Sequence, residues 1–491
     1  MSTASAIRTE PDRPALQAAT TSTLVRWAPA ILAAATAAAI SIPRLDRRPV
    51  WLDEAYTVGA TRDLVATWRG SGGTQAVYYL LMWPVTQLSI APTWIRLPSL
   101  LAAVATVVVV YDIGRRLGGW WMGTVAAATL ACTASLSRFA IEARSYSLAM
   151  LLISLSWLGL VAAAQADDEG SRRRWLRLWA VSLLLAPLAH GMAALHFVSQ
   201  LAVLAASPDR RRWLQACVPV AAGLGVEGLL LFGLGAGEVA DWVAPLNRGQ
   251  VEGVWHLLVG RSTIGLLVGA VALLGAVAGI RRARLDDNGW VQLVPMAWFL
   301  GAPLLLIALS VVRPYGVARY VLGSLPALGL LVGRVVAEVP RRSLQIAATA
   351  AVCLALLVGH GRVTGAYTEN WPGLMSTLQA HADEGERVMT PAEYRTVFDY
   401  WWDRQDAPPE LTALSPVEPL GDIKRFYDAA PGTIRSRLLA DPSTTVWYVD
   451  RGPRGEQRTH RLTHDPQLRR AYDITAWGFR GDLYLLRLEP R

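Results

Sequence analysis

The chain has few cysteines and few charged residues. Its three cysteines, Cys132, Cys217 and Cys353, each lie inside a hydrophobic run, which excludes a disulfide framework and a thiolate metal site and predicts packing roles. Charged residues make up only 17% of the 491 residues, whereas hydrophobic residues make up 53%. This balance, with apolar runs too long for a soluble core, predicts a polytopic membrane protein.

The sequence also lacks internal repeats and nucleotide-binding motifs. The absence of repeats disfavours a transporter built from matching halves, and no phosphate loop or nucleophile elbow follows Gly361. The net charge of +9 could suit nucleic acid, but much of the arginine excess lies in short clusters between apolar segments. Membrane topology explains those clusters better than nucleic-acid binding does.

Hydrophobic segments divide most of the chain into membrane spans. At about 20 apolar residues per span, about eleven spans are expected. A polar tail, residues 1–26, precedes them, and we expect it to be disordered and cytoplasmic. The expected spans are 27–44, 97–114, 118–136, 146–164, 175–190, 192–206, 214–235, 263–280, 290–311, 319–338 and 343–360.

Arginine clusters orient these spans. With the N-terminus inside, every tight cluster between the second and last spans falls on the cytoplasmic side, and the upstream pair Arg47-Arg48 is the exception that lies outside. If segment 77–90 crossed the membrane, the later arginine clusters would lie outside, so we expect this segment to be an amphipathic element at the interface. Segment 175–206 is two spans only if the chain turns near His190. The clusters are 115–116, 172–174, 210–212, 281–284 and 341–342.

An acidic pair follows the first span. Asp53 and Glu54 lie in an apolar and aromatic stretch, residues 49–57, just beyond the membrane. A carboxylate in a partly dry, partly polar niche can act as a general base. Arginines recur in the outer loops 138–146 and 313–320, where the positive-inside rule should deplete them. Binding of a phosphate at the membrane surface explains them.

Several short motifs follow one another as in a known superfamily. In order and spacing they resemble the GT-C membrane glycosyltransferases, especially the branch of protein O-mannosyltransferases and aminoarabinose transferases. The resemblance implies transfer of a sugar from a polyprenyl-phosphate carrier to an outer-face acceptor, interfacial helices in the first outer loop, and Asp53 as catalytic base. The motifs are Asp53-Glu54, Tyr78-Tyr79, Arg96-Leu97-Pro98-Ser99, Glu142-Ala143-Arg144-Ser145-Tyr146 and Arg319-Tyr320.

Further site residues are expected around this base. Glu54 is the second catalytic candidate. Many relatives carry His-Pro-Pro before the paired tyrosines, but this chain reads Gly73-Thr74-Gln75-Ala76-Val77, which leaves acceptor choice and any metal contact of that histidine open. No cofactor is required, and a divalent metal is compatible with the sequence. Donor-phosphate or substrate contacts are expected from Arg96, Glu142, Arg144, Tyr146, His190, Arg313, Tyr315, Arg319 and Tyr320, and a substrate loop from Gln75, Tyr78 and Tyr79.

The chemistry of such a donor calls for one base and several cations. The phosphate leaving group is already a stabilised anion, so deprotonating the incoming hydroxyl and balancing phosphate charge matter most. A loop directly after a span places Asp53 at headgroup depth. A single in-line displacement would invert the anomeric centre without a covalent intermediate. Mannose is the first candidate sugar and arabinofuranose the second.

The acidic and basic candidates near the first loop have simpler structural explanations. Asp53 could cap a short helix that starts at Glu54, a role in which acids are common. Glu142 and Arg144 could form a local ion pair of little energetic value. Capping and catalysis by Asp53 are compatible with each other.

The remaining candidates have structural alternatives too. Arg313 and Arg319 could reach lipid headgroups, beside tyrosines of an aromatic belt. His190 could orient a phosphate or only complete a turn, and His196, deeper in the next span, is expected to be a packed core residue. Glu227 lies inside an apolar span, where a costly carboxylate marks either a site or a paired structural group.

The composition changes after Gly361. Residues 27–360 are expected to form an all-α polytopic membrane domain of GT-C type, and residues 361–491 a small α/β extracytoplasmic domain that covers the site or helps to recognise the acceptor. The evidence for the second domain is alternating apolar stretches at 445–449 and 482–488, helical patterns at 371–382 and 466–472, and a hairpin-like turn at 478–481.

Two other functions compete with the enzyme. A transporter or flippase of a lipid-linked sugar would share the spans and the outer arginines, but the outer acidic pair and soluble tail favour an enzyme. A degenerate relative that acts as a scaffold is kept open by the missing His-Pro-Pro. The expected partners are a polyprenyl-phosphate sugar, the bilayer and a glycan, glycolipid or protein acceptor, with no nucleic acid. The site of this multi-pass cell-membrane protein should face the extracytoplasmic side.

Overall fold

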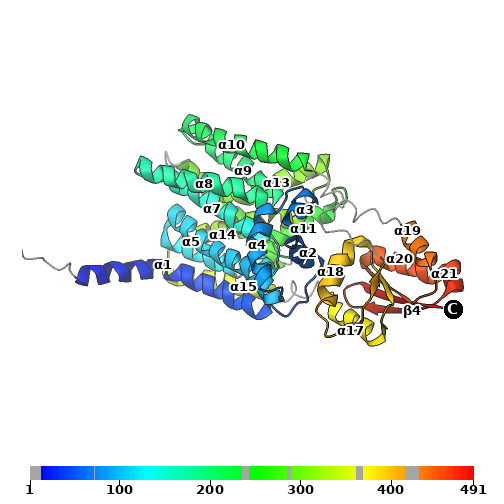
Figure 1. The fold of residues 1–491 in the computed structure, drawn as a ribbon. Helices are drawn as coiled ribbons and strands as arrows, with labels where there is room; N and C mark the ends of the chain where they lie inside the picture. The colour runs from blue at the N-terminus through cyan, green and yellow to red at the C-terminus, as the bar shows by residue number, and fades with distance from the viewer. Residues whose placement is uncertain are drawn as a thin grey trace, which may run out of the picture.

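Long apolar segments form a bundle of helices with an α/β unit at one end (Figure 1). The computed structural model describes residues 13–70, 72–234, 243–261, 263–284, 289–360, 369–414 and 431–491. In this part of the chain, seven helices are long and apolar enough to cross a membrane, and two shorter apolar helices accompany them. The chain is therefore a multi-pass membrane protein.

A helix lies in each segment that hydropathy predicts to be a span. Helix α5 covers two expected spans, because its backbone leaves helical angles at Gly118 and Gly119, where Gly119 has φ +82°. His190 is extended between α8 and α9, so residues 175–206 form two helices. The helices are α1 (Arg13–Ser41), α5 (Pro92–Ala131), α7 (Tyr146–Ala164), α8 (Glu169–Ala189), α9 (Leu195–Ala205), α10 (Arg210–Gly233), α12 (Thr263–Ala283), α13 (Val294–Val312), α14 (Leu325–Ala337) and α15 (Arg342–Val358).

Shorter helices connect these spans. The 3-10 segment η1 (Ile42–Arg44) ends the first span, and α2 (Leu52–Ala60), α3 (Leu64–Gly70) and α4 (Ala76–Leu88) form the first loop. With 13 residues, α4 is only about 20 Å long and too short for a bilayer core of about 30 Å, as expected for an interfacial element. The others are α6 (Ala134–Ala140), η2 (Gly191–Ala194), α11 (Arg248–Val259), η4 (Gly289–Leu293) and η5 (Ala318–Ser324).

The N-terminal helix begins earlier than hydropathy suggests. α1 starts at Arg13, inside the segment 1–26 expected to be a disordered tail, and residues 1–12 lie outside the described residues. Alanine and leucine between Arg13 and Arg26 favour helix, so a helix can begin before the apolar run does.

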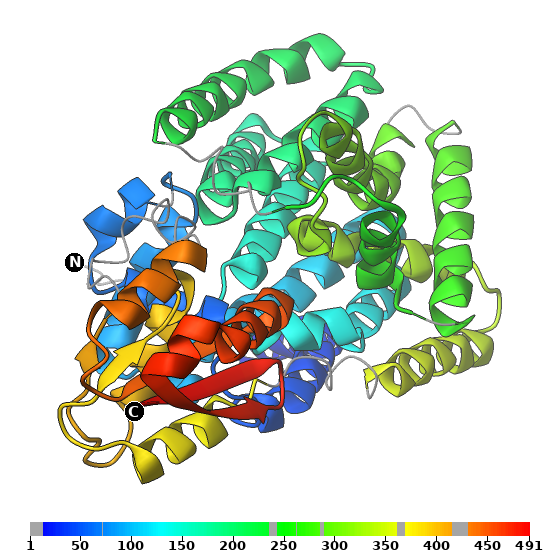
Figure 2. The same cartoon turned by 90° about the vertical axis from the view of Figure 1, so that its right-hand side faces the viewer.

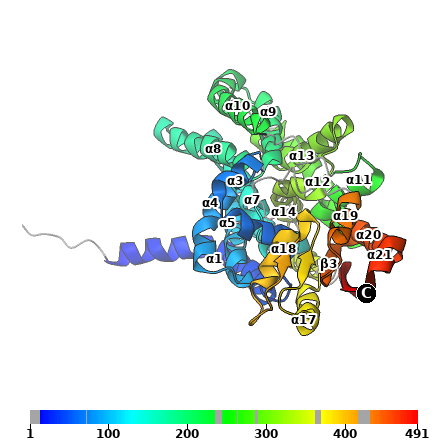
Figure 3. The same cartoon turned by 45° about the vertical axis from the view of Figure 1, so that its right-hand side comes forward.

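Close packing of α14 against α5 forms the centre of the bundle. A Cβ added at Gly329 would lie 2.4 Å from the Ala126 carbonyl oxygen, so glycine is needed for this backbone contact. Trp157 and Trp298 stack 5.6 Å apart in the same interior. Figures 1 and 3 place α10 at the edge of the bundle, where apolar side chains such as Leu229 are exposed as for a lipid-facing helix.

The C-terminal unit, residues 369–491, contains one mixed sheet of order β2-β1-β3-β5-β4. β1 pairs in parallel with β2 and β3, whereas β5 pairs antiparallel with β3 and β4. The strands and helices predicted near residues 371, 445, 466 and 482 are confirmed. The elements are α17 (Trp371–His381), β1 (Arg387–Met389), α18 (Ala392–Trp402), β2 (Thr412–Ala413), α19 (Pro431–Ala440), β3 (Val446–Arg451), α20 (Gly452–His464), α21 (Pro466–Ala471), β4 (Tyr472–Phe479) and β5 (Leu483–Pro490).

One apolar core joins the C-terminal unit to the first loop. Helix α18 packs against α2, and the side chains of both segments are buried together. Figure 2 looks along the bundle from this end and shows the unit over the blue N-terminal part, with much of the green half uncovered. The shared core includes Val50, Ala55, Val58, Tyr78, Tyr79, Met82 and Ile95 from the first loop and its exit, and Trp371, Leu374, Val397, Phe398 and Tyr400 from the unit.

Candidate functional site

Both acids of the pair lie in the first turn of α2. The helix begins at Leu52 with Trp51 as N-cap, so the alternative in which Asp53 caps a helix from Glu54 is wrong. Glu54 instead accepts a hydrogen bond from the Trp51 backbone N–H at 3.4 Å. Negative charge is favourable at a helix N-terminus, which suits both residues. Their side chains nevertheless meet different partners.

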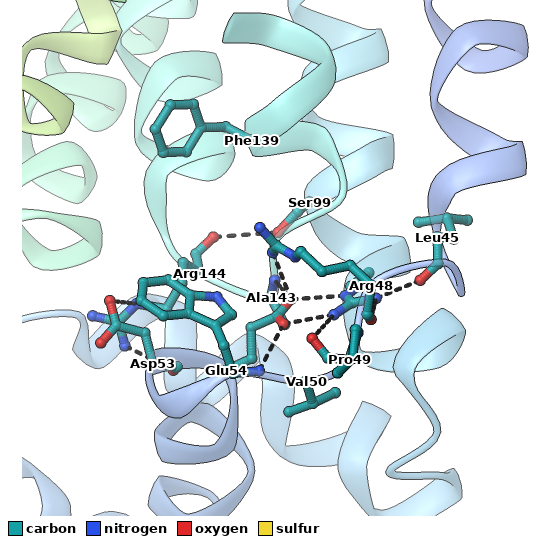
Figure 4. A network of polar contacts seen from close by, with 12 residues as sticks. Leu45, Arg48, Pro49, Val50, Asp53, Glu54, Ser99, Phe139, Ala143 and Arg144 are labelled. Atoms are coloured by element: carbon teal, nitrogen blue, oxygen red, sulfur yellow. Dashed lines mark hydrogen bonds and ion pairs between the residues drawn. The ribbon is translucent and has the colours of Figure 1, made fainter. Parts of the chain in front are cut away.

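Glu54 is buried in an ion pair with Arg96 of α5. Figure 4 shows Glu54 on the side of Arg48 and Ala143, and Asp53 beside Arg144. Arg96 donates from Nε to Oε1 at 2.7 Å and from Nη2 to Oε2 at 2.6 Å, and both side chains are fully buried. The backbone N–H of Ala143 donates to Oε1 at 3.0 Å, and Arg48 Nη2 lies 3.6 Å from it. Such a bidentate pair fixes orientation as well as charge. Glu54 and Arg96 therefore hold the loop together rather than face an open site.

Arg96 also binds the backbone before α2. Its Nη1 donates to the carbonyl oxygens of Leu45 at 2.6 Å and Arg48 at 2.9 Å, and its Nη2 to that of Pro49 at 3.4 Å. The segment from the end of α1 to α2 is thus wrapped around one guanidinium. The prediction that Arg96 contacts the donor phosphate stays a prediction, but the contacts of Arg96 in the structure favour a positioning role.

The Glu54–Arg96 pair predicts an acid-sensitive stability. Burial alone would raise the pKa of Glu54, but Arg96, Arg48 and the Ala143 N–H bring it below its ordinary 4.5. A lowered folded-state pKa means that the ionised carboxylate stabilises the fold fully above about pH 4.5, and that this contribution is lost as the pH falls through the lowered value. The difference in melting temperature between wild type and Glu54→Gln should be constant from pH 7 to 5 and shrink below 4.5. A difference that grows on acidification would contradict this assignment.

Asp53 faces two other arginines. Its Oδ2 lies 3.9 Å from Arg144 Nε and 3.8 Å from Arg319 Nη2, and its backbone carbonyl accepts from Arg144 Nη1 at 3.3 Å. Its side chain is 19% exposed, and among the described residues no donor hydrogen-bonds its Oδ2. The carboxylate therefore lies beside two cations at more than hydrogen-bond distance, and its buried Oδ2 has no hydrogen-bond donor within the described residues.

Aromatic rings line the same place. The His190 ring lies between those of Tyr146, at 5.3 Å, and Tyr320, at 5.0 Å. Arg319 stands over the Tyr146 ring at 5.8 Å, and the charge of Arg144 acts on the buried hydroxyl of Tyr79. Residues from α4, the α6–α7 loop, the α8–α9 junction and η5 therefore converge around Asp53. The structure brings together most of the predicted donor and substrate residues.

Gln75 has an unusual backbone next to this cluster. It has φ +64°, a left-handed conformation that costs energy for a residue other than glycine and recurs at functional sites. Its Oε1 accepts from the Ser145 hydroxyl at 3.2 Å. Gln75 therefore ties the start of α4 to the Arg144 loop.

Two acids near the site have raised pKa values. Burial raises the pKa of Glu142 against the effect of Arg48, and its Oε2 accepts no hydrogen bond within the described ranges. Burial likewise raises the pKa of Glu369, which forms an ion pair with Arg451, and the charge of Asp53 adds to the shift. Glu369 thus brings a carboxylate of the C-terminal unit into electrostatic range of Asp53.

Two of these residues were missed in the sequence. Arg48 carried a usable signal, because it broke the positive-inside pattern just before the acidic pair. Glu369 carried none, since its place depends on how a segment more than 300 residues away in sequence folds back onto α2.

Other predicted residues lie elsewhere. Arg313 is exposed and stands 5.8 Å over the ring of Tyr315, in the loop before η5. His196 is 1% exposed in α9, as expected for a core residue. Glu227 lies on α10 at the edge of the bundle, and its Oε2 is unbonded in the described structure. No group of three or more metal-ligating side chains occurs among the described residues.

The fold and part of the sequence match known proteins. Residues 76–232 match the family model of dolichyl-phosphate-mannose-protein mannosyltransferase. The crystal structure of ArnT from Cupriavidus metallidurans in the apo state has a TM-score of 0.65 and 12% identity, over 96% of this chain and 98% of that one. No curated protein sequence matches this chain.

Two further structures contain lipid carriers. ArnT from the same organism bound to undecaprenyl phosphate has a TM-score of 0.63 and 13% identity, over 93% of this chain and 97% of that one. Archaeal oligosaccharyltransferase AglB from Archaeoglobus fulgidus, in complex with an inhibitory peptide and a dolichol-phosphate, has a TM-score of 0.56 and 10% identity, over 94% of this chain and 74% of that one. Identities this low establish a shared fold and leave the substrates of this chain open.

Proposed function

We propose that this membrane glycosyltransferase, which has the fold of the GT-C superfamily, transfers a sugar from a polyprenyl-phosphate carrier to an extracytoplasmic acceptor, with Asp53 as general base. The observation that carries the proposal is the Asp53 carboxylate, which is flanked by Arg144 and Arg319 and whose buried Oδ2 accepts no hydrogen bond from the described residues. A base beside two cations suits a reaction in which a hydroxyl is deprotonated and a phosphate leaves.

The proposed reaction is a single displacement. Asp53 Oδ2 takes the proton of the acceptor hydroxyl while the oxygen of that hydroxyl attacks the anomeric carbon. The bond from that carbon to the phosphate oxygen breaks, and the phosphate keeps the electron pair. Arg144 and Arg319 balance the phosphate charge, and the anomeric configuration is inverted. Tyr146, His190 and Tyr320 form a wall beside these cations that can exclude water from the displacement.

The arginine clusters support an outward-facing site. Arg212 bonds Glu169 at 2.5 Å, which links α10 to α8, and Arg282 bonds Glu338 at 3.2 Å. These contacts belong to the clusters that the positive-inside rule assigns to the cytoplasm. In Figure 1 the C-terminal unit and α2 lie together at one end of the bundle. If the clusters face the cytoplasm, α2 and the C-terminal unit lie on the extracytoplasmic side.

A panel of donors tests the proposed activity. Purified protein in lipid should release polyprenyl phosphate from one carrier, with mannose as first and arabinofuranose as second candidate sugar. An acceptor product of inverted configuration should appear. Movement of the intact carrier across the bilayer without release would instead support a flippase, and neither release nor movement would support a scaffold.

Arg319 should govern donor binding. Replacing it with glutamine removes one of the two cations near the phosphate and should raise the donor KM about 10-fold, consistent with about 1.5 to 3 kcal/mol for a charged hydrogen bond. Arg248→Gln is a matched control, because Arg248 is 91% exposed and pairs only locally with Glu252 of α11. Equal donor KM values in the two variants would remove Arg319 from the donor site.

A further inference from the structure

Two aromatic residues of the C-terminal unit bind the backbone of the first loop. Trp401 Nε1 donates to the Val50 carbonyl oxygen at 3.0 Å, and the Tyr400 hydroxyl donates to that of Ile90 at 3.0 Å. Both lie at the end of α18, the helix that packs on α2. The two carbonyls lie on either side of the loop, one just before α2 and the other just before α5.

The bond from Trp401 completes a series of bonds to consecutive carbonyls. From the bundle, Arg96 binds the carbonyls of Arg48 and Pro49, and Trp401 binds the next, that of Val50. α2 starts two residues later, at Leu52. The backbone that enters α2 is therefore held from two sides, by a guanidinium of the bundle and by an indole of the C-terminal unit.

Burial makes these bonds effective. Val50 is fully buried and Tyr400 is 2% exposed, whereas Ile90 and Trp401 are half-buried, so water has restricted access to both bonds. Burial raises the pKa of Tyr400 to about 12, which keeps its hydroxyl a donor at any physiological pH. A misplaced entry to α2 would move the Asp53 carboxylate relative to Arg144 and Arg319, and displacements of about 1 Å can cost 100-fold in rate.

We propose that Trp401 and Tyr400 are positioning residues for Asp53, so that the C-terminal unit is a structural part of the catalytic centre. This inference rests on the proposed function for its kinetic consequence, but not for its structural one. Neither residue needs to touch substrate. Their effect is exerted through the Val50 and Ile90 carbonyls, which fix the two ends of the loop that contains α2.

The test is a comparison of Trp401→Phe with Trp402→Phe. Both residues are half-buried neighbours on α18, but Trp402 stacks on Phe398 inside the unit at 5.9 Å. Trp401→Phe keeps an aromatic six-membered ring but loses the five-membered ring with its N–H, so kcat should fall about 10-fold with donor and acceptor KM changed less than twofold. Deuterium uptake over residues 50–60 should rise at the same time. Tyr400→Phe should have the same effects, and Trp402→Phe neither.

The outcomes separate the two proposals. If the wild-type protein turns over no donor, the proposed function is wrong. The positioning role of Trp401 and Tyr400 is then tested by deuterium uptake over residues 50–60 alone. Active wild type with Trp401→Phe equal to Trp402→Phe in both kcat and uptake overturns the positioning role and leaves the function standing. A rise in KM without loss of kcat in Trp401→Phe also overturns it, because it would indicate a substrate contact.

Discussion

Replacing Asp53 with asparagine should reduce sugar transfer by about 10³-fold while the protein folds normally. The change keeps the size of the side chain and removes the proton acceptor, and a positioned general base is worth about 10² to 10⁴ in rate. Since Asp53 is part-exposed and sits beyond hydrogen-bond distance of its arginines, its charge adds little to the fold. Initial rates of polyprenyl-phosphate release would measure the effect.

Two control measurements accompany the Asp53→Asn experiment. The melting temperature of the variant should lie close to that of wild type, which shows that inactivity is chemical. Donor binding should persist, because Arg144 and Arg319 remain in place. If Asp53→Asn transfers sugar at the wild-type rate, the base is another residue, and Glu142, whose buried Oε2 accepts no hydrogen bond from the described residues, is the next acid to replace.

Replacing Arg96 with methionine should destabilise the protein by about 3 to 5 kcal/mol, the usual cost of removing one partner from a buried ion pair. The substitution keeps much of the length of the side chain, but it leaves the Glu54 charge buried and frees the carbonyls of Leu45, Arg48 and Pro49. Thermal unfolding followed by tryptophan fluorescence in lipid discs would detect the loss.

A double variant separates charge from packing. Adding Glu54→Gln to Arg96→Met removes the unpaired charge and should recover part of the lost stability, because a neutral buried pair avoids the desolvation cost. If the double variant is less stable than wild type by the sum of the two single losses, the two side chains act independently and the ion pair is not the stabilising element.

Hydropathy predicted the helices well and their ends less well. An apolar run of about 20 residues can be satisfied only by a helix in lipid, so every expected span contains one. The start of α1 at Arg13 and the joined helix α5 depend on local propensity and on two glycines, which hydropathy does not weigh. The number of crossings is not fixed by these lengths.

The site was harder to predict because neighbouring residues point in different directions. Asp53 and Glu54 are adjacent in sequence, and side chains in consecutive positions of a helix point about 100° apart. One therefore reaches Arg96 in the bundle and the other reaches Arg144 and Arg319. The family resemblance already favours Asp53 as the base, but a sequence motif does not say what each carboxylate contacts. The structure adds that Glu54 pairs with Arg96 and that Oδ2 of Asp53 accepts no hydrogen bond from the described residues.

In the C-terminal unit, too, local patterns predict the elements but not the contacts between distant parts of the chain. Alternation of apolar residues was enough to predict β3, β5 and the hairpin, because strand patterns are local. The docking of Trp401 on Val50 depends on a contact between residues 351 positions apart. No local pattern encodes such a contact.

That shared core has a consequence for how the protein is made. During synthesis the first loop emerges early, while Trp371, Phe398 and Tyr400, which cover its apolar side chains, are added only after the last spans. The apolar side chains of the loop that carries Asp53 therefore stay uncovered while nearly the whole bundle is inserted. Assembly of the proposed catalytic centre then follows insertion of the spans, and a chain that stops before α17 would be inserted while the apolar side chains of the first loop stay uncovered.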